Sequence, residues 1–168
     1  MTTTDPNALD RTAFLAQAGP VFEHSPWVAE RTWVARPFDG VAGLHHAMMQ
    51  VVEAASADEQ LALLRAHPDL AGKAARAGTL TADSTQEQAG VGLDRLSDDE
   101  YARFDRLNTA YRHTFGFPFI VAVKRHTKES ILAAYETRLR NDRAAEIRTA
   151  LVEVGLITRL RLDALFGD

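Results

Sequence analysis

Histidine and glutamate are the residue types in this 168-residue chain best suited to moving a proton near neutral pH. Among the six histidines, His67 stands out because Pro68 follows it and restricts the direction of the chain. A histidine held firmly in this way can face a cleft and act as an acid or a base. The alternative interpretation is a histidine at the end of a helix, where the helix dipole favours its charge.

Ser84 and Glu87 have the spacing of a capping box, which predicts a helix that begins at Ser84. The box alone could explain both residues. A helix start also presents backbone N–H groups to an anionic or carbonyl ligand, and Gln88 adds an amide that donates and accepts. The sequence therefore indicates either a simple cap or a ligand contact at this position.

Arg161 interrupts an otherwise largely apolar stripe near the C-terminus. The stripe has helical spacing and contains Ile147, Leu151, Val154, Thr158, Arg161 and Leu165. A buried charge is costly unless it is paired, so Arg161 is expected to meet a carboxylate of the protein or of a ligand. Arg159 lies off the stripe and is expected to be solvated.

The segment Gly116-Phe117-Pro118-Phe119-Ile120 is expected to form a rigid aromatic turn. It could be a hydrophobic plug between helices. It could also be the wall of a site for a flat ring, with backbone groups nearby for hydrogen bonding.

Metal and cofactor signals are missing from the sequence. There is no cysteine, no His-Glu-x-x-His and no Glu-x-x-His of the helical di-iron type. His45 and His46 are adjacent, so on a helix they point about 100° apart and share an ion poorly. We therefore predict no metal site.

Helical signals dominate and predict an all-α fold, an irregular bundle of about seven to eight helices in a single domain over residues 1–168. Residues 1–8 are expected to be a flexible N-terminal tail. The expected helices cover residues 10–18, 25–36, 39–55, 56–67, part of 69–83, 84–96, 97–113, 128–140 and 143–165. Ser97 and Glu100 have the spacing of a capping box that opens the helix over 97–113. The helix over 39–55 has an apolar stripe at helical spacing that predicts a buried face, namely Val41, Leu44, Met48, Val51 and Val52.

Composition narrows the function classes. Hydrophobic residues make up 46% of the chain and the net charge is −4, which is typical of a globular protein and argues against nucleic-acid binding through bulk charge. No apolar run approaches the roughly 20 residues of a membrane span. With no signal-peptide pattern, a cytoplasmic location is expected.

Several motifs together resemble one enzyme family, the OHCU decarboxylases, which act on 2-oxo-4-hydroxy-4-carboxy-5-ureidoimidazoline (OHCU) in urate breakdown. The resemblance extends from about Phe22 to Leu162. The motifs are Ser25-Pro26-Trp27-Val28, Arg36-Pro37-Phe38, His67-Pro68-Asp69-Leu70-Ala71-Gly72-Lys73, Ser84-Thr85-Gln86-Glu87-Gln88, Leu107-Asn108 with Tyr111, Phe115-Gly116-Phe117-Pro118-Phe119-Ile120 and Arg159-Leu160-Arg161-Leu162.

The resemblance implies an all-α homodimer that needs no cofactor and acts on the small molecule OHCU. It assigns His67 as the catalytic acid/base and Glu87 as its partner. The substrate contacts that it implies are Pro68, Ser84, Gln88, Phe119, Ile120 and Arg161. Two alternatives remain at this point: a non-catalytic helical ligand-binding module, and a different cofactor-free lyase or hydrolase of ureido compounds.

Overall fold

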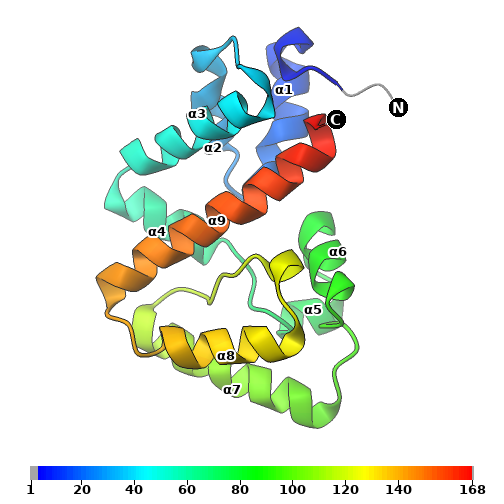
Figure 1. Cartoon of the computed structure of the whole chain (residues 1–168), viewed down its shortest axis with the longest axis vertical. Helices are drawn as coiled ribbons and strands as arrows, with labels where there is room; N and C mark the ends of the chain where they lie inside the picture. Colours follow the sequence, from blue (N-terminus) through cyan, green and yellow to red (C-terminus); the bar gives the residue numbers. More distant parts are fainter. Residues whose placement is uncertain (1–3, 168) are drawn as a thin grey trace. The chain divides into compact units, whose positions relative to one another are not determined.

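A computed structural model describes residues 4–167, and every regular element within that range is a helix (Figure 1). Nine α-helices and four short 3-10 helices are present there, and seven of the α-helices have eight or more residues. The predicted all-α bundle of about seven to eight helices is confirmed. The α-helices are α1 (Arg11–Ala18), α2 (Trp27–Thr32), α3 (Gly40–Ala54), α4 (Ala57–Arg65), α5 (Lys73–Ala77), α6 (Ala82–Gly90), α7 (Asp98–Phe115), α8 (Lys128–Arg138) and α9 (Arg143–Phe166).

The contacts of the chain group it into two compact units, although the sequence indicated no break. Unit 1 comprises Met1–Ala66 and Gly155–Asp168, and unit 2 comprises His67–Val154. The long helix α9 contributes to both, because the boundary falls between Val154 and Gly155.

Unit 1 is built around α1, α2 and α3, in which α2 packs on α3 and α1 contacts α2. The apolar stripe predicted for the helix over residues 39–55 forms part of its core. Leu44, Met48 and Val52 lie on one face of α3, and their side chains are fully buried. Burial of this face is what stabilises α3 within the unit.

The N-terminal segment is tied down where the structure describes it. A short 3-10 helix, Pro6–Ala8, places Asn7 beside the backbone of Phe38. Asn7 Nδ2 donates to the Phe38 carbonyl at 2.8 Å, and the Phe38 N–H donates to Asn7 Oδ1 at 2.7 Å. Residues 5–8 are therefore not the free tail that the sequence suggested, and residues 1–3 lie outside the described range.

His45 on α3 gives unit 1 an expected pH dependence. Its Nε2 bonds to the Gly155 carbonyl at 2.9 Å, and burial lowers its pKa below the ordinary value of 6.5. The unfolded chain therefore binds the proton more tightly, and the free energy of unfolding should fall as pH drops below about 6.5.

The substitution His45→Gln keeps an N–H donor for Gly155 but removes the titrating group. Urea unfolding between about pH 8 and pH 5 should show a flatter pH profile for this variant than for the wild type. Identical slopes in the two proteins would contradict this account of His45.

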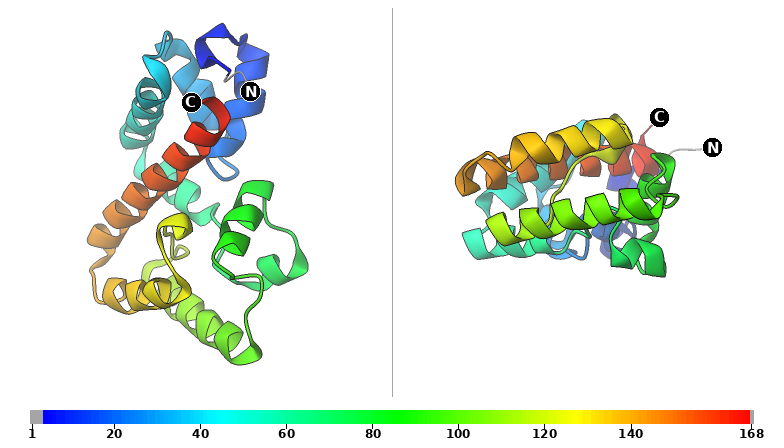
Figure 2. Two further views of the ribbon diagram at one scale, coloured as in Figure 1. Left: turned by 45° about the vertical axis from the view of Figure 1, so that its right-hand side comes forward. Right: turned by 90° about the horizontal axis from the view of Figure 1, so that it is seen from below.

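Unit 2 is organised by α7 and α8, which pack on each other (Figure 2). The capping box predicted at Ser97 and Glu100 is present and opens α7. Gly116 ends this helix with a φ of +83°, a left-handed conformation that glycine adopts without strain. The buried segment 117–122 then leads to a 3-10 helix, Val123–Arg125, which packs on α6.

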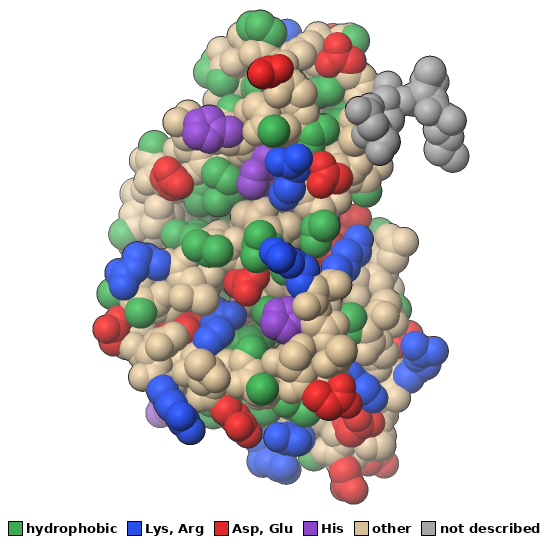
Figure 3. Space-filling view, viewed as in Figure 1, with side chains coloured by type: hydrophobic (Ala, Val, Ile, Leu, Met, Phe, Trp, Pro, Cys, Tyr) green, Lys and Arg blue, Asp and Glu red, His purple; other side chains and the backbone are tan. Residues whose placement is uncertain are grey.

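Acidic and basic side chains are interspersed on the face of the molecule that Figure 3 shows. This mixture agrees with the small net charge of the sequence. None of the helices in the described part of the chain combines the length and the apolar character that a bilayer crossing needs.

Candidate active site

Seven of the eight predicted site residues lie in unit 2, and Arg161 lies in unit 1. In unit 2, His67 and Pro68 begin a loop that continues to Gly72, ahead of α5. His67 is buried, with only 6% of the residue exposed. A buried imidazole in a fixed loop suits a proton-transfer group, because its position relative to a ligand varies little.

Two side chains from neighbouring helices hold this loop by its backbone. Gln88 on α6 accepts a hydrogen bond from the Ala71 N–H at 2.9 Å and donates to the Asp69 carbonyl at 3.4 Å. Asn108 on α7 donates to the Leu70 carbonyl at 2.8 Å. Both side chains are buried, so the loop is fixed to α6 and α7 immediately after His67 and Pro68.

The loop also contains an unfavourable backbone conformation, which these hydrogen bonds hold in place. Ala71 has a φ of +52°, a left-handed conformation that is unfavourable for a residue with a Cβ. An added Cβ at Gly72 would lie 3.0 Å from the Asp69 Cβ, so a side chain at this position would press tightly against Asp69. An unusual backbone held by surrounding hydrogen bonds is typical of functional sites.

The capping box predicted at Ser84 and Glu87 is wrong, because the N-cap of α6 lies three residues earlier. Thr81 is the N-cap, and its side chain accepts a hydrogen bond from the Ser84 N–H at 3.3 Å. Ser84 and Glu87 are therefore inside the helix. With Gln88 they share one face, since residues three and four apart are neighbours on a helix. A helix cap therefore does not explain the presence of Ser84 and Glu87 at these positions.

Phe119 and Ile120 are buried in the segment that leads from α7 towards α6. The Phe119 ring stacks on Tyr135 with centroids 3.8 Å apart and planes 18° apart. Tyr111 meets the same ring edge-on, with centroids 5.3 Å apart. The prediction of a rigid aromatic turn is consistent with this packing.

A cavity of about 360 Å³ is lined in part by this loop. Among the predicted site residues, Pro68 alone lines it. Its other lining residues are Asp69, Gly72, Lys73, Ala74, Asp105, Asn108 and Arg112. The predicted site residues therefore do not converge on this cavity.

Arg161 faces inward, as the stripe predicted, and it is paired with a carboxylate of the protein. Its Nη2 lies 2.9 Å from Glu23 Oε1, and its Nη1 donates to the Val21 carbonyl at 3.0 Å. Both charged side chains are buried, at 4% and 1% exposed. Arg159 is exposed and pairs with Asp163 on the surface. Glu23 is a partner that the sequence pattern did not reveal.

Within the described residues, no group of three or more histidine, aspartate or glutamate side chains could hold a metal ion. The candidate site comprises His67, the face of α6 that carries Ser84, Glu87 and Gln88, and the aromatic segment. It offers an imidazole, a carboxylate, a hydroxyl and backbone groups for proton transfer and hydrogen bonding.

Comparisons with known proteins define the class. The family model described as OHCU decarboxylase matches residues 7–163. A 2-oxo-4-hydroxy-4-carboxy-5-ureidoimidazoline decarboxylase of Halalkalicoccus jeotgali is 46% identical over 98% of this chain and 92% of that relative. One of Mus musculus is 38% identical over 96% of this chain and 90% of that relative.

A solved structure agrees with these sequence matches. The crystal structure of (S)-allantoin synthase is similar with a TM-score of 0.77 and 32% identity, covering 99% of this chain and 54% of that chain. The chain is thus an enzyme of the carboxy-lyase class, which decides against the binding-module alternative. It belongs to the OHCU decarboxylase family.

Proposed function

We propose that this enzyme decarboxylates OHCU to (S)-allantoin in urate breakdown. The single structural observation that carries the proposal is the role of Gln88. Its side-chain amide ties the loop that begins at His67 to α6, the helix that carries Ser84 and Glu87. These two hydrogen bonds fix the loop that follows His67 to the helix that carries Glu87.

The chemistry of the substrate explains why this residue set could suffice. When the bond to CO₂ breaks, its electron pair moves toward the adjacent ring C=N, whose nitrogen takes a proton. The hydroxyl-bearing carbon then becomes a carbonyl as the hydroxyl loses its proton, and the ureido-bearing carbon gains one. The substrate thus supplies the electron sink that many decarboxylases obtain from a cofactor.

In this proposal His67 is the acid/base, because imidazole exchanges protons readily at neutral pH. Glu87 is its partner and orients the imidazole or binds the hydroxyl and ureido N–H groups. Delivery of the final proton to one face sets the handedness of the product. The proposed substrate contacts are Pro68, Ser84, Gln88, Phe119, Ile120 and Arg161.

In addition to contacting the substrate, Gln88 and Arg161 would each make a structural contact within the protein. Gln88 fixes the loop, and Arg161 is positioned by Glu23. A planar guanidinium suits a forked contact with a carbonyl or anionic edge of the ligand. The resemblance further supports a homodimer.

The proposal is tested by following the decay of freshly generated OHCU by its absorbance, with and without the enzyme. A panel of related ureido acids run in parallel distinguishes this activity from that of another lyase or hydrolase. We expect acceleration with OHCU alone. Faster turnover of another member of the panel would replace the proposed substrate.

Glu87→Gln should separate catalysis from structure. Glu87 lies within α6, where glutamine has nearly the same helix propensity, so the melting temperature should change little. If the negative charge serves catalysis, kcat/KM should fall by at least about 10-fold. Glu129→Gln, an exposed neutralisation on α8, should leave both quantities unchanged. Unaltered turnover of Glu87→Gln would return Glu87 to a structural role.

A further inference from the structure

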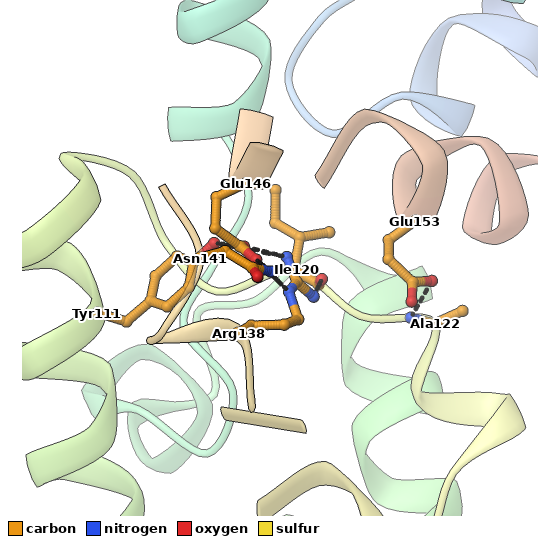
Figure 4. Close-up of polar contacts among 7 residues, drawn as sticks. All are labelled: Tyr111, Ile120, Ala122, Arg138, Asn141, Glu146 and Glu153. Atoms are coloured by element: carbon orange, nitrogen blue, oxygen red, sulfur yellow. Dashed lines mark hydrogen bonds and ion pairs between the residues drawn. The ribbon is translucent and has the colours of Figure 1, made fainter. Parts of the chain in front are cut away.

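A buried ion pair in unit 2 joins two helices beside the aromatic segment (Figure 4). Arg138, in the last turn of α8, contacts Glu146 in the first turns of α9. The closest approach is 2.9 Å, between Arg138 Nη2 and Glu146 Oε2, and Arg138 Nε donates to both carboxylate oxygens. The two side chains are 8% and 0% exposed, so this contact is almost fully removed from solvent.

Two further side chains fix the Glu146 carboxylate. Asn141 Nδ2 donates to Oε1 at 2.9 Å, and the Tyr111 hydroxyl donates to Oε2. Burial and this hydrogen bond raise the pKa of Tyr111, so its hydroxyl keeps its proton and remains a donor. Because both carboxylate oxygens are held, the guanidinium that faces them has one defined position.

The remaining arm of Arg138 reaches the aromatic segment. Nη1 donates to the Ile120 carbonyl at 2.6 Å, and the guanidinium carbon lies 4.4 Å from the centre of the Phe119 ring. In a trans peptide the N–H points opposite to the carbonyl, so Arg138 also sets the direction of the Val121 N–H. Two residues after Ile120, the backbone N–H of Ala122 donates a hydrogen bond to Glu153 Oε2, with the nitrogen and oxygen 3.4 Å apart.

We propose that Arg138 and Glu146 are positioning residues that fix the Phe119–Ile120 segment for substrate binding. This inference rests on the proposed function, in which that segment contacts the substrate. A buried ion pair is a poor device for stability alone, because packed apolar residues of similar size often stabilise a protein as well or better. Its use here is geometric, since it orients one carbonyl and one ring at the same time.

The test uses Glu146→Gln and Arg138→Lys in the complete enzyme. Each keeps the approximate size of the side chain, but the first removes the charge and the second removes the planar fork. We expect KM for OHCU and Kd for (S)-allantoin to rise about 10-fold or more, with a smaller change in kcat. Tyr111→Phe, which removes one hydrogen bond and keeps the ring, should shift both constants in the same direction but less.

Glu136→Gln is the matched control, because it neutralises an exposed carboxylate on α8 that pairs with Arg103 on α7. It should change neither constant. A loss of folded protein lowers apparent kcat but leaves KM unaltered, so unchanged KM and Kd in all three network variants would overturn the proposal.

A second readout does not depend on the substrate. Amide hydrogen exchange of residues 119–122 should become faster in Glu146→Gln, while that of α3 stays as in the wild type. Unchanged exchange in this segment would also overturn the positioning role. If the wild type neither turns over OHCU nor binds (S)-allantoin, the proposed function fails, and the exchange experiment still decides whether the pair orders the segment.

Discussion

Replacement of His67 by alanine is expected to lower kcat by about 10²-fold or more while the protein stays folded. The proposed role requires a group that gives and takes protons at neutral pH, and alanine cannot do either. The loop should keep its shape, because Gln88 and Asn108 hold it through the backbone of residues 69–71. Steady-state kinetics and thermal melting of His67→Ala check both parts of this expectation.

His113→Ala is the control for His67, since His113 is an exposed histidine on α7 of the same unit. It should have wild-type kinetics. Binding of (S)-allantoin to His67→Ala should persist if His67 acts mainly in proton transfer. Near-normal turnover in a folded His67→Ala enzyme would refute the assignment.

Arg161→Ala is expected to have the largest effect on stability. It would leave the Glu23 carboxylate buried without this cation, and breaking such a pair costs roughly 3–5 kcal/mol. Arg159→Ala breaks only an exposed pair with Asp163 and should cost less than about 1 kcal/mol. Urea unfolding of the two variants measures this difference directly.

A comparison of Arg161→Lys with Glu23→Gln separates the structural role of Arg161 from substrate binding. Both weaken the buried pair, but only Arg161→Lys removes the fork that would grip the ligand. If Arg161 contacts OHCU, its lysine variant should raise KM more than Glu23→Gln does. A stable, fully active Arg161→Ala enzyme would contradict both roles.

Features that depend on local periodicity could be predicted from the sequence. The three-to-four spacing of Leu44, Met48 and Val52 identified the buried face of α3 because a helix repeats every 3.6 residues. The same reasoning distinguished buried Arg161 from exposed Arg159. Periodicity reports which side of a helix meets the core, and it requires no knowledge of the partner.

The start of α6 was not predicted correctly, because two hydroxyl residues compete to cap it. Thr81 and Ser84 are three apart, and either side chain can accept a hydrogen bond from a backbone N–H further along. The apparent box of Ser84 and Glu87 favoured the later start. In the structure Thr81 caps the helix, which adds one turn and moves Glu87 into its interior.

Contacts between distant residues were beyond local reasoning. Arg161 and Glu23 are 138 positions apart, and no spacing rule connects them. Helical spacing could have indicated that Arg138 is buried, since it shares a helical face with Ile131 and Tyr135, which are both buried. An arginine on that face indicates a buried pair, but its partner Glu146 could only be identified from the fold.

The handedness of the product tests the central claim most directly. Freshly generated OHCU should be mixed with the wild-type enzyme and with His67→Ala, and the allantoin signal followed by circular dichroism. The account predicts a one-handed signal for (S)-allantoin that grows as OHCU disappears with the wild type, and a much slower signal with the variant. Racemic product, formed at the uncatalysed rate in the presence of the wild-type enzyme, would contradict it.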